Sequence, residues 1–327
     1  MIHKINLKKF ILFFLVIFFL LEILLRVFAP LYFTGSIEAY EYDDLLGVKV
    51  KKNLNLVKIT DVRQEYITNN IGTFNFEDDF SVYDKIVFAA GDSYTQGTGV
   101  SPSSSYPFNL YINLNTSKKK TKKTYGVLNL GLAAYGFDQS FLTIKKYFND
   151  IKPDYIIYLG VGNDERDDFL FKSGHRHNHL VSGSPKFFGL GNKIGYFTNN
   201  IEILKRIKLI ISKRKVSASY KINNSNESSF NFNKYIALKE FSELNNIKLL
   251  ISWYQCHKSE INNYNKLKIW SEKNNIDFVD WCADFKKIKS LNPNLPFANN
   301  HSSGHHRPWL YKIIAKNISD KIIHDEE

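Results

Sequence analysis

Four polar segments that follow or end apolar runs contain the groups that acyl transfer needs. GDSYTQG (91–97) follows KIVFAA, NLGLAAYG (129–136) ends a second run, GVGND (160–164) ends a third, and HSSGHHRP (301–308) lies near the C-terminus. A serine can serve as nucleophile, an imidazole as its general base, and amide N–H groups as oxyanion donors. Each segment alone is a common Gly or Asn turn, so the prediction depends on all four together.

The serine candidate is Ser93, which stands between an apolar run and a helix-like segment. Gly91 and Gly97 permit a tight strand-to-helix turn around Asp92 and Ser93. A serine in such a turn points into a crevice with backbone N–H groups around it. Taken alone, however, the GDS tripeptide favours a structural turn.

Two further loops supply the remaining roles. The side-chain amide of Asn163 and a backbone N–H of residues 129–136 could both point at an oxyanion. His301, His305 and His306 precede a final helix-like segment, and any of them could be the general base. The alternative for each histidine is a surface position without a role.

The segments that must position these residues alternate between β-prone and helical patterns. Short apolar runs at 85–90, 127–131, 154–160, 247–254 and 276–281 predict strands, with helices at 103–114, 138–149, 232–245 and 262–274. This alternation predicts an α/β fold with a five-stranded parallel sheet between helical layers. Ligands bind at the carboxyl ends of such strands, which is where the polar segments lie.

The N-terminus has the pattern of a membrane anchor, here assigned to residues 1–31. Lys4, Lys8 and Lys9 precede a nearly unbroken apolar run, and no small-residue cleavage site follows. With Glu22 and Arg26 near the outer interface, the segment approaches the roughly 20 residues that a bilayer requires. An uncleaved anchor is preferred to a cleaved signal peptide or a buried helix, and the remaining chain would face the periplasm or the extracellular side.

The remaining organisation is read from composition. Residues 32–84 predict an extended or hairpin lead-in, and residues 85–327 predict the main domain, with an insertion at about 165–231 that is a lid or a mobile segment. The net charge of +12 includes basic runs at 118–123 and 205–215. Such runs are solvated faces, or they attract anionic lipid or acidic polysaccharide. No motif favours a nucleic-acid partner.

In their order and placement, GDSYTQG, NLGLAAYG, GVGND and a C-terminal histidine resemble the four conserved blocks of the SGNH (GDSL-type) hydrolases, over roughly residues 85–320. The resemblance implies a flavodoxin-like three-layer α/β/α fold with a Ser-His-Asp triad or a Ser-His dyad. It implies Ser93 as nucleophile and first oxyanion donor, and Asn163 as side-chain donor. The flanking residues with supporting roles would be Gly91, Asp92, Gly162 and Asp164.

The second block departs from the family pattern, because Ala134 stands where the family usually has glycine. A backbone N–H donor does not require glycine if φ is negative. Ala134 is therefore the predicted second oxyanion donor, and Gly131 and Gly136 are the alternatives.

The acid of the triad is missing from its usual place, three residues before the histidine. Ser302 holds that place before His305, and Ala298 before His301. Because GHHRP resembles the family's Gly-His-x-x-Pro ending, His305 is the predicted base and His301 the alternative. The tautomer of His305 would then be fixed by a backbone carbonyl, by Ser302 or Ser303, or by Asp284. The expected enzyme is a dyad or a weakened triad.

The two cysteines follow the fourth and fifth predicted strands. A flavodoxin-like order makes these strands neighbours about 4.8 Å apart, so Cys256 and Cys282 can form a disulfide or remain paired thiols.

These observations predict an extracytoplasmic serine esterase that hydrolyses or transfers an O-acyl group, with O-acetyl groups of cell-envelope carbohydrate preferred. A lipase, lysophospholipase or thioesterase at the membrane surface is the alternative enzyme, and a non-catalytic glycan-binding or assembly domain is the alternative to an enzyme.

No cofactor is expected. The histidines at 175, 177 and 179, or those at 301–306, could bind metal, but neither group has the spacing of a known site, so no metal is predicted.

Overall fold

The fold was analysed in a computed structural model of the chain. It describes residues 7–29, 39–59, 63–116, 122–172, 201–207, 232–257, 260–299 and 304–327, together with the single residues 194 and 198.

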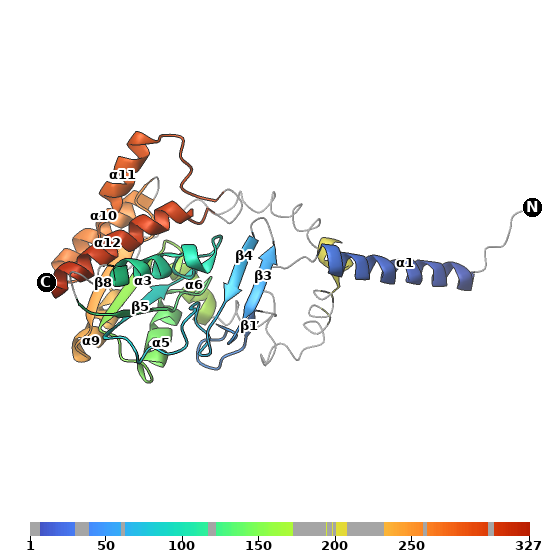
Figure 1. Ribbon diagram of the computed structural model, residues 1–327, viewed down its shortest axis with the longest axis horizontal. Coiled ribbons are helices and arrows are strands. Elements are labelled where there is room, and N and C mark those ends of the chain that lie inside the picture. The colour runs from blue at the N-terminus through green and yellow to red at the C-terminus, as the bar shows by residue number, and fades with distance from the viewer. Residues whose placement is uncertain are drawn as a thin grey trace, which may run out of the picture.

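A parallel sheet of five strands forms the centre of the molecule (Figure 1). Its strands are β5 (Lys85–Gly91), β6 (Tyr125–Asn129), β7 (Tyr155–Gly160), β8 (Lys248–Trp253) and the short β9 (Asp277–Phe278). They lie in the order β6-β5-β7-β8-β9, so the direction of the connections reverses between β5 and β7. β6 is wholly buried, as is β7, which explains the unbroken apolar runs in the sequence. The predicted five-stranded α/β fold is confirmed.

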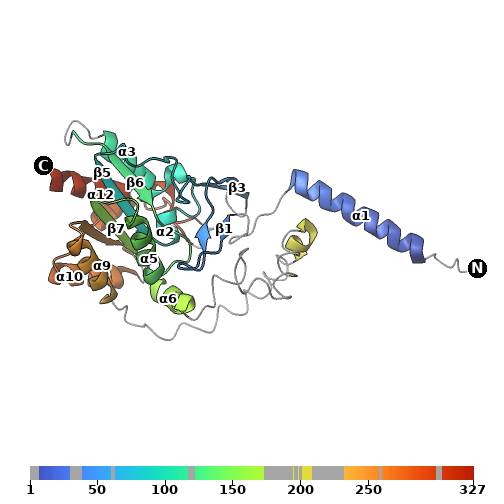
Figure 2. The ribbon, with the colours of Figure 1, turned by 90° about the horizontal axis from the view of Figure 1, so that it is seen from below.

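Helices cover both faces of the sheet (Figure 2). On one face α3 (Tyr106–Thr116) packs against α12 (Pro308–Glu326), and α11 (Cys282–Leu291) contacts α12. On the other face α5 (Phe137–Phe148), α9 (Lys234–Leu244) and α10 (Ile261–Lys273) are joined by aromatic contacts such as Phe141–Phe241 and Tyr235–Trp270. The three-layer α/β/α arrangement follows.

Three short elements lie next to the carboxyl ends of the strands. They are α2 (Ser93–Gln96), the 3-10 helix η1 (Pro102–Ser104) and α6 (Asp164–Lys172). α6 was not predicted, because DERDDFLFK has no apolar period. Its start is favourable nevertheless, since acidic side chains in the first turn interact well with the helix dipole.

The segment before the sheet forms two antiparallel hairpins. β1 (Tyr40–Glu41) pairs with β2 (Lys49–Val50), and β3 (Asn55–Ile59) pairs with β4 (Arg63–Ile67). Their buried side chains form a second apolar cluster, which also includes Leu132 and Tyr135 from the loop after β6. We call the residues 39–80 the lead-in segment. It packs on the loop that was predicted to supply an oxyanion donor.

The N-terminal helix α1 (Leu7–Phe28) extends away from the rest of the molecule (Figure 1). It is long and apolar enough to cross a bilayer, and its only buried residue is Glu22. Glu22 pairs with Arg26 at 2.8 Å and accepts the backbone N–H groups of Glu202 and Ile203 at 2.8 and 3.1 Å. The carboxylate in this apolar helix is therefore fully engaged by polar partners.

Cys256 and Cys282 form a disulfide, with their Cα atoms 5.7 Å apart. Because β8 and β9 are neighbouring strands, the residues that follow them lie within reach of each other.

Removing this disulfide is expected to lower the free energy of unfolding by about 3.5 kcal/mol, the loop-entropy value for cysteines 26 residues apart. The measurement is denaturant unfolding of the full-length chain with and without reductant. A Cys256→Ser, Cys282→Ser double variant is the control and should not respond to reductant. An unchanged midpoint after reduction of the wild-type chain would contradict the prediction.

Candidate active site

Ser93 lies at the tip of β5, where the strand turns into α2. Gly91 has φ 146°, and a Cβ there would come within 2.9 Å of the Leu159 carbonyl oxygen, so glycine is needed. Asp92 caps α2 by accepting the Tyr94 N–H at 2.9 Å. Ser93 is the first residue of α2, so its own N–H has no acceptor within the helix. This N–H is available to an oxyanion.

His305 reaches Ser93 from the far end of the chain. Its Nε2 lies 2.7 Å from the Ser93 Oγ, although the two residues are 212 positions apart. His305 stands just before Pro308 begins α12, which directs it toward the carboxyl ends of the strands. The distance is that of a nucleophile and its general base. The alternative base His301 lies outside the described residues.

Asp284 does not hold His305, contrary to one of the expectations. It accepts a hydrogen bond from Asn317 Nδ2 at 3.0 Å and lies 4.0 Å from the Lys316 amine. Both partners belong to α12, and α11 carries Asp284 to the side of this helix. Ser302 and Ser303 are the other side chains that could fix the His305 tautomer. Both lie outside the described residues.

Asp92 places a carboxylate in contact with Ser93. Its Oδ2 lies 3.2 Å from Ser93 Oγ, so the serine hydroxyl has two acceptors, this oxygen and His305 Nε2. Burial, together with the negative charge of Asp167, raises the pKa of Asp92 to about 6. Asp92 is therefore mainly ionised at neutral pH, and its charge favours a cation on the imidazole that shares the same hydroxyl.

Asn163 lies at the start of α6, and its amide is held by two carboxylates. Asn163 Nδ2 donates to Asp167 Oδ2 at 2.6 Å and lies 3.5 Å from Asp92 Oδ2. Asp167 is fully buried and one helical turn further along the chain. Our reading of the sequence missed this contact, although side chains four positions apart on a helix are expected to meet.

The loop after β6 leaves one backbone N–H without an acceptor among the described residues. Between Leu130 and Tyr135, every N–H except that of Ala134 has a protein acceptor among the described residues. The acceptors are the Ala89 and Gly91 carbonyls for Leu130 and Leu132, Asn129 Oδ1 for Gly131, Gln96 Oε1 for Ala133, and the Leu132 carbonyl for Tyr135. The Gly131 N–H is thus already hydrogen-bonded. Gly136 lies at the start of α5 and packs against Asp168 of α6. The geometry favours Ala134 over both alternatives.

The conformation of Ala134 differs from the expectation. Its φ is +68°, whereas the prediction required a negative φ. The left-handed region costs a residue with a Cβ roughly 1–2 kcal/mol. Alanine in place of glycine at position 134 therefore strains the backbone. The sequence analysis did not predict this strain, because it expected a negative φ.

Ala134→Gly is expected to raise the free energy of unfolding by about 0.5–1 kcal/mol, because relief of the left-handed strain exceeds the entropy that glycine adds to the unfolded chain. Denaturant unfolding of the full-length chain measures the change. Ala133→Gly is the matched control. Ala133 has no positive φ, so this change should lower the free energy of unfolding by about 0.5–1 kcal/mol. Equal effects of the two changes would refute strain at Ala134.

An aromatic cluster that was not predicted surrounds His305. The Tyr94 ring lies 4.7 Å from the His305 ring, 4.5 Å from Tyr254 and 4.8 Å from His306. His306 is buried, and its Nε2 lies 2.5 Å from the Tyr254 carbonyl oxygen. Burial lowers the pKa of His306 to about 3, so this ring is neutral. No apolar period announces the cluster, because its members come from three separate segments.

The remaining predicted residues support the loops. A Cβ at Gly131 would lie 2.3 Å from the Gln96 nitrogen, and one at Gly162 would lie 2.9 Å from Glu260 Oε1. Asp164 Oδ2 accepts the Tyr158 hydroxyl at 2.7 Å and the Val161 N–H at 3.2 Å. Burial raises the pKa of Asp164 well above its usual value.

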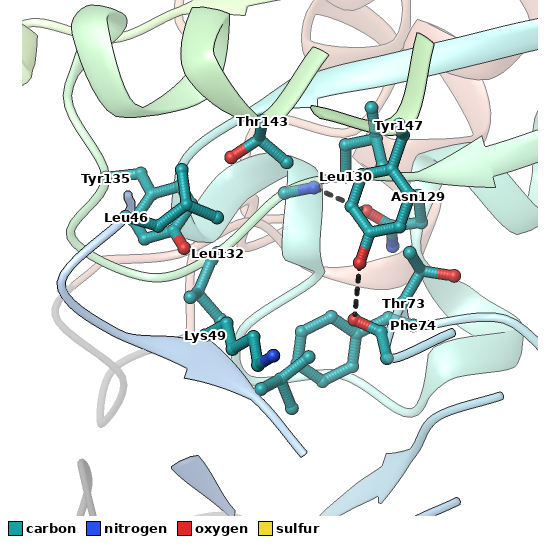
Figure 3. Close-up of a pocket in the computed structure, with 13 residues that line it drawn as sticks. Leu46, Lys49, Thr73, Phe74, Asn129, Leu130, Leu132, Tyr135, Thr143 and Tyr147 are labelled. Atoms are coloured by element: carbon teal, nitrogen blue, oxygen red, sulfur yellow. Dashed lines mark hydrogen bonds between the residues drawn. The ribbon is translucent and has the colours of Figure 1, made fainter. Parts of the chain in front are cut away.

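A small cavity lies behind the loop, between it and the lead-in segment (Figure 3). Its volume is about 20 Å³, room for about one water molecule, and its lining includes Lys49, Asn129, Leu132 and Tyr147. Ser93 is not part of the lining. The cavity is therefore separate from the nucleophile.

Within the described residues, no group of three or more His, Cys, Asp or Glu side chains could hold a metal ion. The histidines at 175, 177 and 179 lie outside this part of the chain.

Comparison with models of known protein families finds no match, and neither does comparison with curated protein sequences. Among solved structures, an acetyl xylan esterase is similar at 16% identity and a TM-score of 0.42, with 72% of this chain and 99% of the other covered. A GDSL-like lipase from Parabacteroides merdae gives 12% identity and a TM-score of 0.42, with 75% and 97% covered. An acetyl-xylooligosaccharide esterase from Geobacillus gives 13% and 0.39, with 73% and 94% covered. The chain is thus similar to GDSL-type lipases and acetyl xylan esterases at low identity, and its chemistry must be argued from its own site.

Proposed function

We propose that this protein is a serine esterase of the SGNH type, with Ser93 as nucleophile and His305 as general base. The observation that carries the proposal is the 2.7 Å contact between Ser93 Oγ and His305 Nε2 at the carboxyl ends of the strands. A serine, an imidazole and unused amide N–H groups at one strand edge form the arrangement that acyl transfer needs.

The reaction has two steps. Ser93 Oγ attacks the ester carbonyl, and its proton passes to His305 Nε2. The oxyanion accepts hydrogen bonds from Ser93 N–H, from Ala134 N–H and from the Asn163 amide hydrogen that otherwise makes only the 3.5 Å contact with Asp92. The alcohol then leaves with the proton from His305. Water, activated by the same imidazole, attacks the acyl-enzyme and releases the acid and Ser93.

The proposed substrate is an O-acetyl group on a carbohydrate. Support comes from the polar and aromatic surroundings of the site. The Glu260 carboxylate lies against Gly162, next to Asn163, and it also accepts the Trp253 N–H at 2.9 Å. A carboxylate beside the acyl site disfavours a long apolar chain and can accept hydrogen bonds from sugar hydroxyls.

The proposed location is outside the cytoplasmic membrane, with α1 as anchor. The exposed apolar surface of α1 and the lysines at its start support this orientation. The substrate would then be a component of the cell envelope.

The test is hydrolysis of p-nitrophenyl esters from acetyl to palmitoyl, and of acetylated xylo-oligosaccharides, by the full-length chain in detergent. Ser93→Ala should abolish turnover, and acetyl esters should be the best substrates. Preference for long acyl chains would replace the carbohydrate assignment with a lipase or thioesterase at the membrane surface. Turnover that survives Ser93→Ala, or no turnover by the wild-type chain, would overturn the serine mechanism and favour a binding role.

A further inference from the structure

The Tyr94 ring lies over the imidazole of His305. The ring centroids are 4.7 Å apart, the planes are inclined by 32°, and Tyr94 is only 8% exposed. At this distance and inclination the two rings are in tilted contact, within the roughly 6 Å over which an aromatic ring attracts a cation. The face of an aromatic ring attracts a cation, and the attraction increases where water is excluded.

Tyr94 is fixed in this position from two sides. Its backbone N–H is bound by Asp92, and its ring is packed between Tyr254 and His306. His306 is neutral, because burial lowers its pKa to about 3, and its Nε2 lies 2.5 Å from the Tyr254 carbonyl oxygen. The neighbouring histidine therefore does not repel a positive charge on His305.

We propose that Tyr94 is a positioning residue that orients His305 and stabilises the imidazolium formed when Ser93 transfers its proton, the role that an aspartate fills in a triad. The inference rests on the proposed esterase function. The sequence has Ser302 where a triad aspartate would stand, and the Tyr94 ring, 4.7 Å from the imidazole, offers stabilisation of the same charge. The contribution acts along with any hydrogen bond that His305 Nδ1 makes.

Other titratable and charged groups lie on the elements around Tyr94 and His305, and they must stay constant in the test. They are Asp92 at the start of α2, Asp167 on α6, Tyr254 and Glu260 around the end of β8 and the start of α10, and His306, Arg307 and Tyr311 at the start of α12. A change confined to the side chain of Tyr94 leaves the Asp92 hydrogen bond to its backbone in place.

The experiment compares Tyr94→Phe, which keeps the ring, with Tyr94→Leu, which keeps apolar bulk without a π-face. The measurement is the pH profile of kcat/KM for p-nitrophenyl acetate with the full-length chain. Tyr94→Leu should lower the plateau about 2- to 30-fold and move the acid limb to lower pH by about 0.4 to 1.5 units, because the imidazolium loses stabilisation. Tyr94→Phe should keep both the height of the plateau and the position of the acid limb. A merely structural role would lower the plateau without moving the limb.

Two additions keep the test decisive. Fluorinated phenylalanines at position 94 preserve the shape of the ring while weakening its π-face, so the limb should move further with each added fluorine even if Tyr94→Leu does not fold. Tyr111→Leu is the matched control, since the Tyr111 ring contacts Tyr83 and Phe108, and the limb should stay in place. Ser93-dependent turnover with an acid limb that ignores ring fluorination would overturn the role of Tyr94 alone. A wild-type chain without Ser93-dependent turnover would overturn the esterase function and this inference together.

Discussion

His305→Ala is expected to lower kcat for p-nitrophenyl acetate by about 10²- to 10⁴-fold, because Ser93 loses the base that lies 2.7 Å from its hydroxyl. The two residues act as one unit, so the Ser93→Ala, His305→Ala double variant should be scarcely slower than Ser93→Ala alone. Steady-state rates of the three variants measure this overlap.

His324→Ala is the control for the removal of an imidazole, because His324 is exposed near the end of α12 and should keep full activity. If His305→Ala retained wild-type turnover, another base would serve Ser93. His301 would then be the next residue to replace.

Asn163→Ala should lower kcat by about 10²- to 10³-fold, which corresponds to about 2.7–4 kcal/mol of transition-state stabilisation from a lost oxyanion donor. KM should change little, since the hydrogen bond strengthens only as charge develops on the carbonyl oxygen. The measurement is the separation of kcat from KM for an acetyl ester.

Asp167 extends this prediction, because it holds the Asn163 amide at 2.6 Å. Asp167→Ala should lower kcat in the wild-type background and have almost no effect once Asn163 is alanine. Asp168→Asn is the matched control: it is the next buried acid of α6, but it pairs with Lys234 at 2.7 Å and should change unfolding rather than kcat. Additive losses for Asn163 and Asp167 would show that Asp167 acts on the fold and not through the donor.

The sheet and the order of the site residues could be predicted from the sequence, because both depend on local patterns. Each parallel strand is a short apolar run, and the carboxyl ends of these runs carry the polar segments. The contact between Ser93 and His305 followed from that placement, together with the family resemblance. The N-terminal helix was visible for the same reason, since its apolar run is continuous.

The features that escaped prediction depend on contacts between distant segments or on backbone angles. The positive φ of Ala134 is imposed by the packing of its loop, and alanine gives no sign of it. The sequence offered Asp284 as a carboxylate that could fix the His305 tautomer, but α11 directs it toward Asn317. The ring contact between Tyr94 and His305 joins residues from opposite ends of the domain, so no periodicity could reveal it.

The lead-in segment makes the loop after β6 depend on the N-terminal part of the domain. The Tyr135 hydroxyl donates to the Val48 carbonyl at 2.5 Å. The side-chain amide of Asn75 donates to the Val127 carbonyl and accepts the Asn129 N–H. During synthesis the hairpins emerge first and must wait for residues 125–136 before they can pack. A single proteolytic cut within 39–80 would therefore be expected to loosen the loop after β6 while leaving Ser93, His305 and Asn163 intact.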